Sequence, residues 1–156
     1  MSRRILAISF LAVLFFSGCS ISKTATPRSS LPTMESNWVV VSMTHSGGIM
    51  GLSHSIEISS DGKYTVIDER EDRSISKQLG TDELTKLKEV ITNSEYIVME
   101  SPQPSGCADC FIYDLAIQGS GKKFSVHLDD ISLPGSGMET LVTYLRELIE
   151  TTLQQK

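Results

Sequence analysis

An alternation of large apolar and other side chains in the segment FIYDLAI most narrows the folds open to this chain. Phe111, Tyr113, Leu115 and Ile117 recur at every second position. Successive side chains of a β-strand point to opposite faces, so this period predicts a strand with one buried face. A glycine-rich turn follows, and a second alternation at 124–128 completes the pattern of a β-hairpin.

Three more strands are expected near the beginning of the folded part. The run WVVVSMT, Trp38–Thr44, is β-branched and aromatic, which suits a pleated surface. Residues 52–58 alternate, and Ser60-Asp61-Gly62 then predicts a tight turn into a strand at 64–66. The stretch DEREDR, Asp68–Arg73, mixes charges of both signs, and we interpret it as a solvated strand end or loop without function.

Two other segments have the helical period. Apolar residues spaced by three and four positions predict a helix that Thr81 caps and that ends at Asn93. A second helix is expected around 141–149, with Ser136 and Glu139 at capping-box spacing. The order of three strands, a helix, two strands and a helix predicts an α+β fold, a mostly antiparallel sheet of about five strands packed against two helices.

The N-terminus has the three parts of a secretory signal. Two arginines precede the mostly apolar run Ile5–Phe16, and Ser17-Gly18-Cys19 follows. The run is shorter than the roughly 20 residues that a spanning helix needs, which favours a signal peptide over a retained transmembrane helix. Phe16-Ser17-Gly18-Cys19 resembles the bacterial lipobox, so Cys19 is the expected lipidation site. The alternative is an ordinary cleavage site beside a chance cysteine.

This signal divides the chain of 156 residues into three expected parts. Residues 1–18 are the lipoprotein signal peptide, 19–36 the lipidated cysteine with a Ser-, Thr- and Pro-rich flexible tether, and 37–156 one folded domain. Several acyl chains, palmitate among them, would anchor the chain stably to a membrane. The expected location is therefore the bacterial cell envelope, on the extracytoplasmic side of a membrane.

Charge excludes one class of partner. Once Arg3 and Arg4 leave with the signal, 12 basic and 19 acidic residues remain, a net charge of −7 against −5 for the whole sequence. An acidic chain repels phosphate backbones, so no nucleic-acid partner is expected.

Cys107 and Cys110 form the pair that most suggests chemistry. A structural zinc site would need two more ligands at similar spacing, and His45, His54 and His127 are not paired in the sequence. A thioredoxin-like motif places its first cysteine at a helix N-terminus, whereas this pair precedes an expected strand. Because the expected compartment is oxidising, we predict a local disulfide, and keep a redox or metal role as an alternative.

No catalytic motif accompanies the remaining polar residues. The sequence contains no nucleophilic serine elbow, no HExxH and no phosphate-binding loop. The three histidines are interpreted as surface or half-buried residues. Asp129 and Asp130 are neighbours, and adjacent strand residues point to opposite faces, so they do not form a carboxylate pair. We therefore expect no enzyme, no cofactor and no metal site.

Two loops combine glycine or proline with apolar side chains: His45–Gly51 and Asp129–Gly137. Loops of this kind on a rigid domain favour binding to another macromolecule. The alternative is that Ile49 and Met50 pack into the core. The candidate partner-binding residues are Gly47, Gly48, Ile49, Met50 and Gly51.

The order of these motifs resembles the emfourin family. The resemblance extends from Trp38 to Leu153 and rests on short motifs: SGGIMG at 46–51, an Asp-Gly hairpin, a helix with L-x-x-L, Ser-Pro at 101–102, CADCFxY at 107–113, and a Gly-Lys hairpin before a Leu-rich helix. It implies a small α+β domain with an antiparallel sheet. It also implies an inhibitor of thermolysin-like zinc metalloproteases.

The combined expectation is a monomeric, membrane-anchored lipoprotein whose domain binds, and through the resemblance inhibits, such a metalloprotease. The zinc would belong to the protease. The alternative is a non-catalytic envelope lipoprotein that serves as a structural or assembly module and binds another envelope protein.

Overall fold

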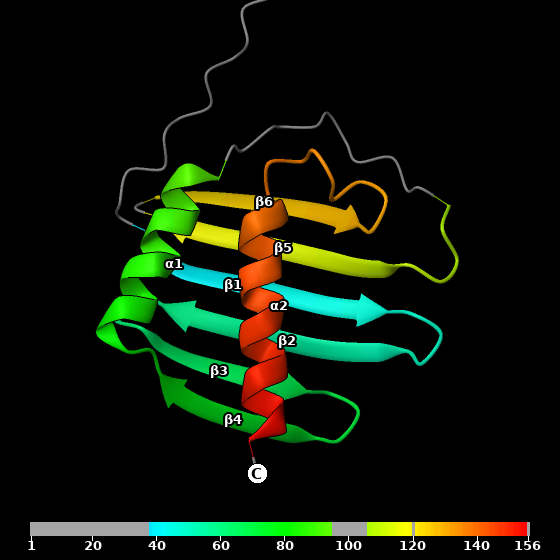
Figure 1. The fold of residues 1–156 in the computed structure, drawn as a ribbon, viewed down its shortest axis with the longest axis horizontal. Helices are drawn as coiled ribbons and strands as arrows, with labels where there is room; N and C mark the ends of the chain where they lie inside the picture. Colours follow the sequence, from blue (N-terminus) through cyan, green and yellow to red (C-terminus); the bar gives the residue numbers. More distant parts are fainter. Residues whose placement is uncertain (1–37, 95–105, 120, 156) are drawn as a thin grey trace, which may run out of the picture.

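Strand β1, Trp38–Gly47, lies inside the six-stranded sheet around which the domain is built (Figure 1). The computed structural model describes residues 38–94, 106–119 and 121–155. The expected signal peptide, Cys19 and the tether lie outside these residues, as does the Pro-containing part of the loop before Cys107.

The elements follow one another in the order β-β-β-β-α-β-β-α. The other bounds are β2 (Leu52–Ser59), β3 (Lys63–Asp68), β4 (Arg73–Gln78), α1 (Thr81–Asn93), β5 (Phe111–Gly119), β6 (Lys122–Asp129) and α2 (Glu139–Gln154). The strand order is β4-β3-β2-β1-β5-β6. Every neighbouring pair is antiparallel, so the predicted α+β class is confirmed.

Strand β4 was not predicted, and the sheet has six strands where about five were expected. Its sequence, RSISKQ, contains one large apolar residue, Ile75, and so lacks the alternation that marked the other strands. The strand forms at the sheet edge, where only β3 pairs with it, in a register that includes Val66 opposite Ile75. An edge strand is partly solvated and tolerates polar side chains.

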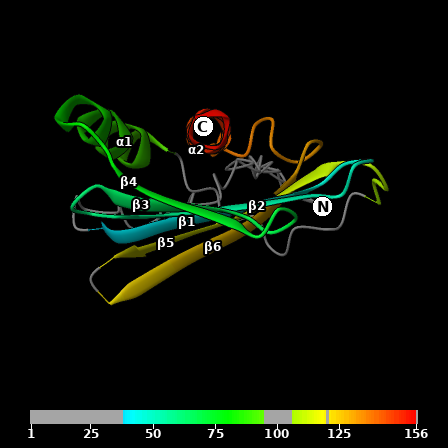
Figure 2. The same cartoon turned by 90° about the horizontal axis from the view of Figure 1, so that it is seen from below.

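Both helices pack against the same face of the sheet, which we call the inner face (Figure 2). The hydroxyls of Tyr64 on β3 and Thr152 on α2 lie 3.2 Å apart in a buried hydrogen bond. The Tyr144 hydroxyl of α2 donates to the carbonyl of Glu83 on α1 at 3.2 Å. The domain thus has two layers, with its core between them.

The core follows the apolar periods of the sequence. Tyr113, Leu115 and Ile117 are buried on the inner face, as the alternation predicted, while Phe111 is half-buried. The predicted stripe of the second helix supplies the opposite layer, with Leu141, Val142, Leu145 and Ile149 fully buried. Burial of one such side chain contributes about 1.5–3 kcal/mol.

The predicted helix caps were wrong by one or two residues. Gly80, not Thr81, is the N-cap of α1, and its backbone N–H donates to the Glu83 carboxylate at 2.8 Å. Met138 is the N-cap of α2, which makes Glu139 the first helical residue and removes the capping-box spacing from Ser136. The Ser136 hydroxyl instead accepts the Met138 N–H at 3.1 Å.

Candidate functional site

Four connections gather at one end of the sheet, the right-hand end in Figure 1, which we call the loop end. They are the β1–β2 turn at 48–51, the β3–β4 turn at 69–72, the segment 106–110 before β5, and the β6–α2 loop at 130–138. The chain enters the sheet at Trp38, which lies at the other end because β1 begins there. Both loops that the sequence marked as apolar therefore lie at the loop end.

The turn between β1 and β2, Gly47–Gly51, forms the hairpin tip. Gly47, Gly48 and Gly51 have φ values of 96°, 69° and 61°, a region that side chains disfavour. The Gly51 N–H donates to the Gly48 carbonyl at 2.9 Å and closes the turn. Between them, Ile49 is 88% exposed and Met50 is 75% exposed. The two apolar side chains project into solvent and do not pack into the core.

Neighbouring segments hold this tip in place. The Gly48 N–H donates to the Cys110 carbonyl at 3.2 Å, and the Phe111 ring packs so closely that a Cβ on Gly48 would lie 2.7 Å from it. On the other side, the Arg70 guanidinium donates to the Met50 carbonyl at 2.6 Å. The hairpin tip is therefore fixed from two directions, which lowers the conformational entropy that binding would cost.

Cys107 and Cys110 form the predicted disulfide, with their Cα atoms 5.6 Å apart. Cys107 is exposed and Cys110 is half-buried. The bridge closes the short segment that leads into β5, beside the hairpin tip. Its place in the fold is therefore the loop end, where Cys110 contacts Gly47 and Gly48.

The β6–α2 loop adds a third exposed apolar side chain, Ile131, which is 62% exposed. Asp130 fixes the loop to β5, because its carboxylate accepts the Phe111 N–H at 2.8 Å and the Tyr113 hydroxyl at 2.9 Å. Asp129 instead accepts the N–H groups of Ile131 and Ser132 within the loop. The two aspartates therefore have separate partners, in agreement with the expectation that they do not form a carboxylate pair.

His45 lies buried beneath the loop end, so its predicted surface or half-buried position was wrong. It is 5% exposed, and its ring lies between Phe111, with ring centres 4.9 Å apart, and Tyr113, at 5.1 Å. Among the residues that the structure describes, neither ring nitrogen has a hydrogen-bond partner. The pKa of His45 is lowered to about 4, chiefly by burial; the nearby Arg146 and His54 also lower it, and Asp130 opposes them.

The other two histidines pair with carboxylates on opposite faces of the sheet. His54, half-buried on the inner face, lies 3.6 Å from Asp68. His127, exposed on the other face, lies 2.6 Å from Asp114. Within residues 38–94, 106–119 and 121–155, no three His, Cys, Asp or Glu side chains are placed to hold a metal ion.

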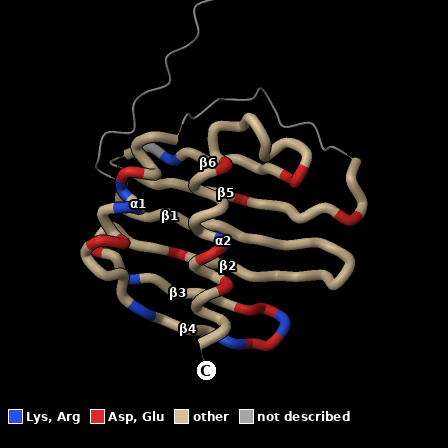
Figure 3. The backbone as a smooth tube through the Cα atoms, in the orientation of Figure 1, with Lys and Arg blue, Asp and Glu red and all other residues tan. Residues whose placement is uncertain are grey.

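The charges at the loop end are mostly negative (Figure 3). The exposed acids there are Glu69, Glu71, Asp72, Asp109 and Asp130. Two basic residues lie among them, Arg70 in the β3–β4 turn and Arg73 at the start of β4. Three exposed apolar side chains with a mainly acidic surround fit a partner surface that is apolar at its centre and basic around it.

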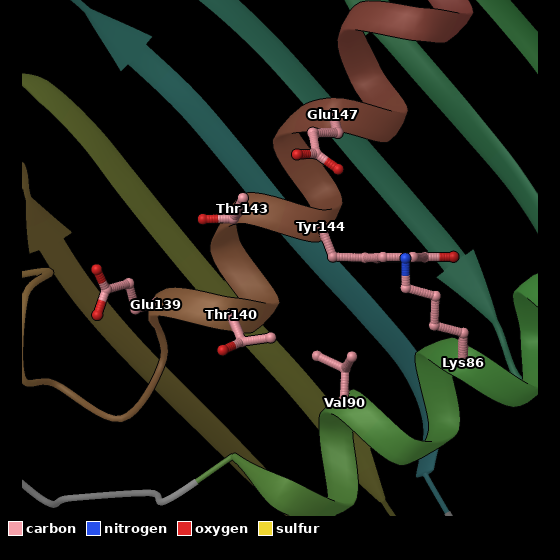
Figure 4. A pocket seen from close by; sticks show the side chains of 7 residues that line it. All are labelled: Lys86, Val90, Glu139, Thr140, Thr143, Tyr144 and Glu147. Carbon is pink, nitrogen blue, oxygen red and sulfur yellow. The ribbon is translucent and has the colours of Figure 1, made fainter.

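A groove of about 280 Å³ lies away from the loop end, between α1 and α2 (Figure 4). Lys86 of α1 extends over the Tyr144 ring, with its ammonium nitrogen 5.4 Å from the ring centre. Glu139 and Glu147 line the α2 side, and Val90 lines the α1 side.

Ile131 and Arg70 are site residues that sequence reasoning did not single out, and Asp130 was considered there only as a member of a carboxylate pair. Ile131 was noted only as part of a loop, and Arg70 as one charge of a solvated run. The roles of Arg70 and Asp130 depend on contacts with residues 17 to 20 positions away. No periodic signal in the sequence reports such contacts.

Comparison with known proteins adds no assignment, because no family model and no curated protein matches the chain. Among the helices of the described residues, none has the length and apolar content required to cross a membrane.

Proposed function

We propose that this chain is a lipid-anchored protein of the bacterial cell envelope whose domain binds and inhibits a thermolysin-like metalloprotease. The observation that carries the proposal is the hairpin tip, where Ile49 and Met50 are exposed on a backbone that is held by Cys110 and Arg70. The resemblance of the chain to the emfourin family supplies the class of partner.

The hairpin tip protrudes from the domain, so the partner has to provide the cavity that receives it. Ile49 and Met50 project from a turn, so the partner must provide a concave apolar pocket that receives them. An active-site cleft is such a pocket. The tip would fill it and exclude substrate, and the chain itself would contribute no catalytic group. The catalytic zinc would be that of the protease.

The position of the tip relative to the anchor supports a partner away from the membrane. The tether predicted from Cys19 joins the domain at Trp38, and β1 extends ten residues from there to Gly47. At about 3.3 Å per residue, this strand places the tip roughly 30 Å from the point of attachment. On a flexible tether, the tip could therefore reach a partner that lies beyond the membrane surface.

The test is a series of progress curves for a thermolysin-like protease titrated with the full chain in detergent micelles. We expect stoichiometric, competitive loss of activity. The double variant Ile49→Asp/Met50→Asp should weaken inhibition at least 100-fold, because two charges would enter an apolar pocket, while circular dichroism stays unchanged. Val39→Asp is the matched control, because Val39 is 48% exposed at the opposite end of the sheet.

Two results would contradict this proposal. Equal inhibition by the double variant and the unsubstituted chain would exclude the hairpin tip as the binding element. No inhibition of several such proteases by the folded chain would exclude the partner class. The structural or assembly role would then replace it.

A further inference from the structure

The disulfide and the hairpin tip are in direct backbone contact. The Cys110 carbonyl accepts the Gly48 N–H, and a Cβ on Gly47 would lie 2.5 Å from that same oxygen. Cys110 is therefore both half of the disulfide and the residue on which the tip rests. A change in the conformation of residues 106–110 would be transmitted to the tip.

The disulfide is also accessible to a reductant. Cys107 is exposed, whereas Cys110 is half-buried against the tip. Thiol–disulfide exchange requires a thiolate to approach one sulfur along the S–S axis, and exposure makes that approach possible. Because Cys107 is the more exposed residue of the pair, its sulfur is the expected point of attack for an incoming thiolate.

We propose that Cys107–Cys110 is a redox modification site for a dithiol reductant, and that its reduction loosens the hairpin tip and weakens partner binding. The statement about binding rests on the proposed function. The statement about the tip rests on the contacts of Cys110 alone.

The exchange is balanced between the protein and the dithiol. A thiolate of the reductant attacks Sγ of Cys107, forms a mixed disulfide and releases the Cys110 thiolate. The second thiol of the reductant, as its thiolate, then attacks the reductant sulfur of the mixed disulfide and releases the Cys107 thiolate. The protein gains two electrons and, on protonation of its thiolates, two protons. The dithiol becomes a disulfide.

Reduction weakens one of the two supports of the tip and leaves the other unchanged. Segment 106–110 is no longer closed, so the Cys110 carbonyl is held less firmly under Gly48. The Arg70 contact to Met50 remains, as does the Gly51-to-Gly48 hydrogen bond. The tip therefore loosens without unfolding. Binding must then fix the backbone of about one more residue, and this loss of conformational entropy corresponds to roughly tenfold weaker affinity.

Amide hydrogen exchange tests this without any partner. The full chain in detergent micelles is compared before and after treatment with dithiothreitol, with alkylation and peptide mass to verify reduction at Cys107 and Cys110. We expect the Gly48 amide to exchange at least tenfold faster after reduction. The Gly62 amide is the internal control, because it donates to Ser59 at 2.7 Å in the turn at the opposite end of the sheet.

The double variant Cys107→Ser/Cys110→Ser should reproduce the fast Gly48 exchange without reductant. An unchanged Gly48 amide, equal acceleration at Gly62, or a disulfide that dithiothreitol does not reduce would each overturn the proposal.

Affinity for the protease is then measured in both redox states. We expect about tenfold weaker binding by the reduced chain, and equal affinities would overturn the coupling to binding. A protease that binds neither state, while Gly48 responds to reduction, would count against the proposed function and support the redox site.

Discussion

Acidification should destabilise this domain through a single buried histidine. Within the described part of the chain neither ring nitrogen of His45 has a hydrogen-bond partner, and its pKa is lowered, chiefly by burial, to about 4 from the ordinary value of 6.5. In the unfolded chain the ring is solvated and regains the ordinary pKa. The folded state therefore holds His45 neutral over a pH range in which the unfolded state binds a proton.

The sign and size of the effect follow from this difference. Above pH 6.5 both states are neutral, and His45 adds no pH dependence. Between pH 6.5 and 4 the unfolded state gains a proton that the folded state does not. The free energy of unfolding therefore decreases as the pH is lowered. From pH 7.5 to 5.0 the fall due to His45 is about 2 kcal/mol, and it reaches about 3 kcal/mol below pH 4.

Urea unfolding at pH 7.5 and pH 5.0 measures this fall. Trp38, the one tryptophan of the chain, is buried and reports unfolding by its fluorescence. With a typical denaturant slope of about 2 kcal/mol per molar, the loss corresponds to a midpoint shift of roughly 1 M. Because other groups titrate too, the quantity to compare is the shift in the unsubstituted chain against the shift in His45→Phe.

His45→Phe should remove most of the shift, because the new ring can pack between Phe111 and Tyr113 but cannot bind a proton. His127→Phe is the control and should leave most of the shift in place, because His127 is exposed. If His45→Phe and the unsubstituted chain lose the same stability on acidification, then His45 is not held neutral in the fold. A gain in stability at pH 5 that His45→Phe abolishes would instead show that Asp130 stabilises the protonated ring.

Three further predictions concern the tip, the core and the anchor. Gly47→Ala should lower the free energy of unfolding, measured with urea, by at least about 2 kcal/mol, because φ is 96° and the new Cβ would lie 2.5 Å from the Cys110 carbonyl. Gly51→Ala is its control and should lower it by only about 1 kcal/mol, because φ is 61° and the new Cβ would have nothing within 4 Å. Leu145→Ala should cost about 2–5 kcal/mol in the same assay, because Leu145 is fully buried between α2 and the sheet. Cys19→Ala should abolish incorporation of labelled palmitate in cells and move the chain out of the membrane fraction; continued labelling would show that another residue carries the lipid.

Much of the fold could be predicted because its signals are local. A strand or helix with one buried face shows its period in the sequence itself, so Phe111 to Ile117 and the stripe around Leu145 predicted their elements and their buried faces. Glycine turns marked the hairpins for the same reason, since a backbone with positive φ favours glycine at that position in the sequence. The Cys107–Cys110 disulfide also joins residues close in sequence, and the sequence suggested it.

Only the tertiary structure decided the features that depend on contacts between distant segments. β4 forms because β3 offers it a pairing edge, and Ile75 alone gave no sign of this. His45 is buried because Phe111 and Tyr113, more than 60 positions away, pack on its ring. Likewise, Arg70 supports Met50 across two strands. Local periodicity in the sequence determines which face of a strand or helix is apolar. Strand pairing determines which residues from distant segments come into contact, and the candidate site depends on such contacts.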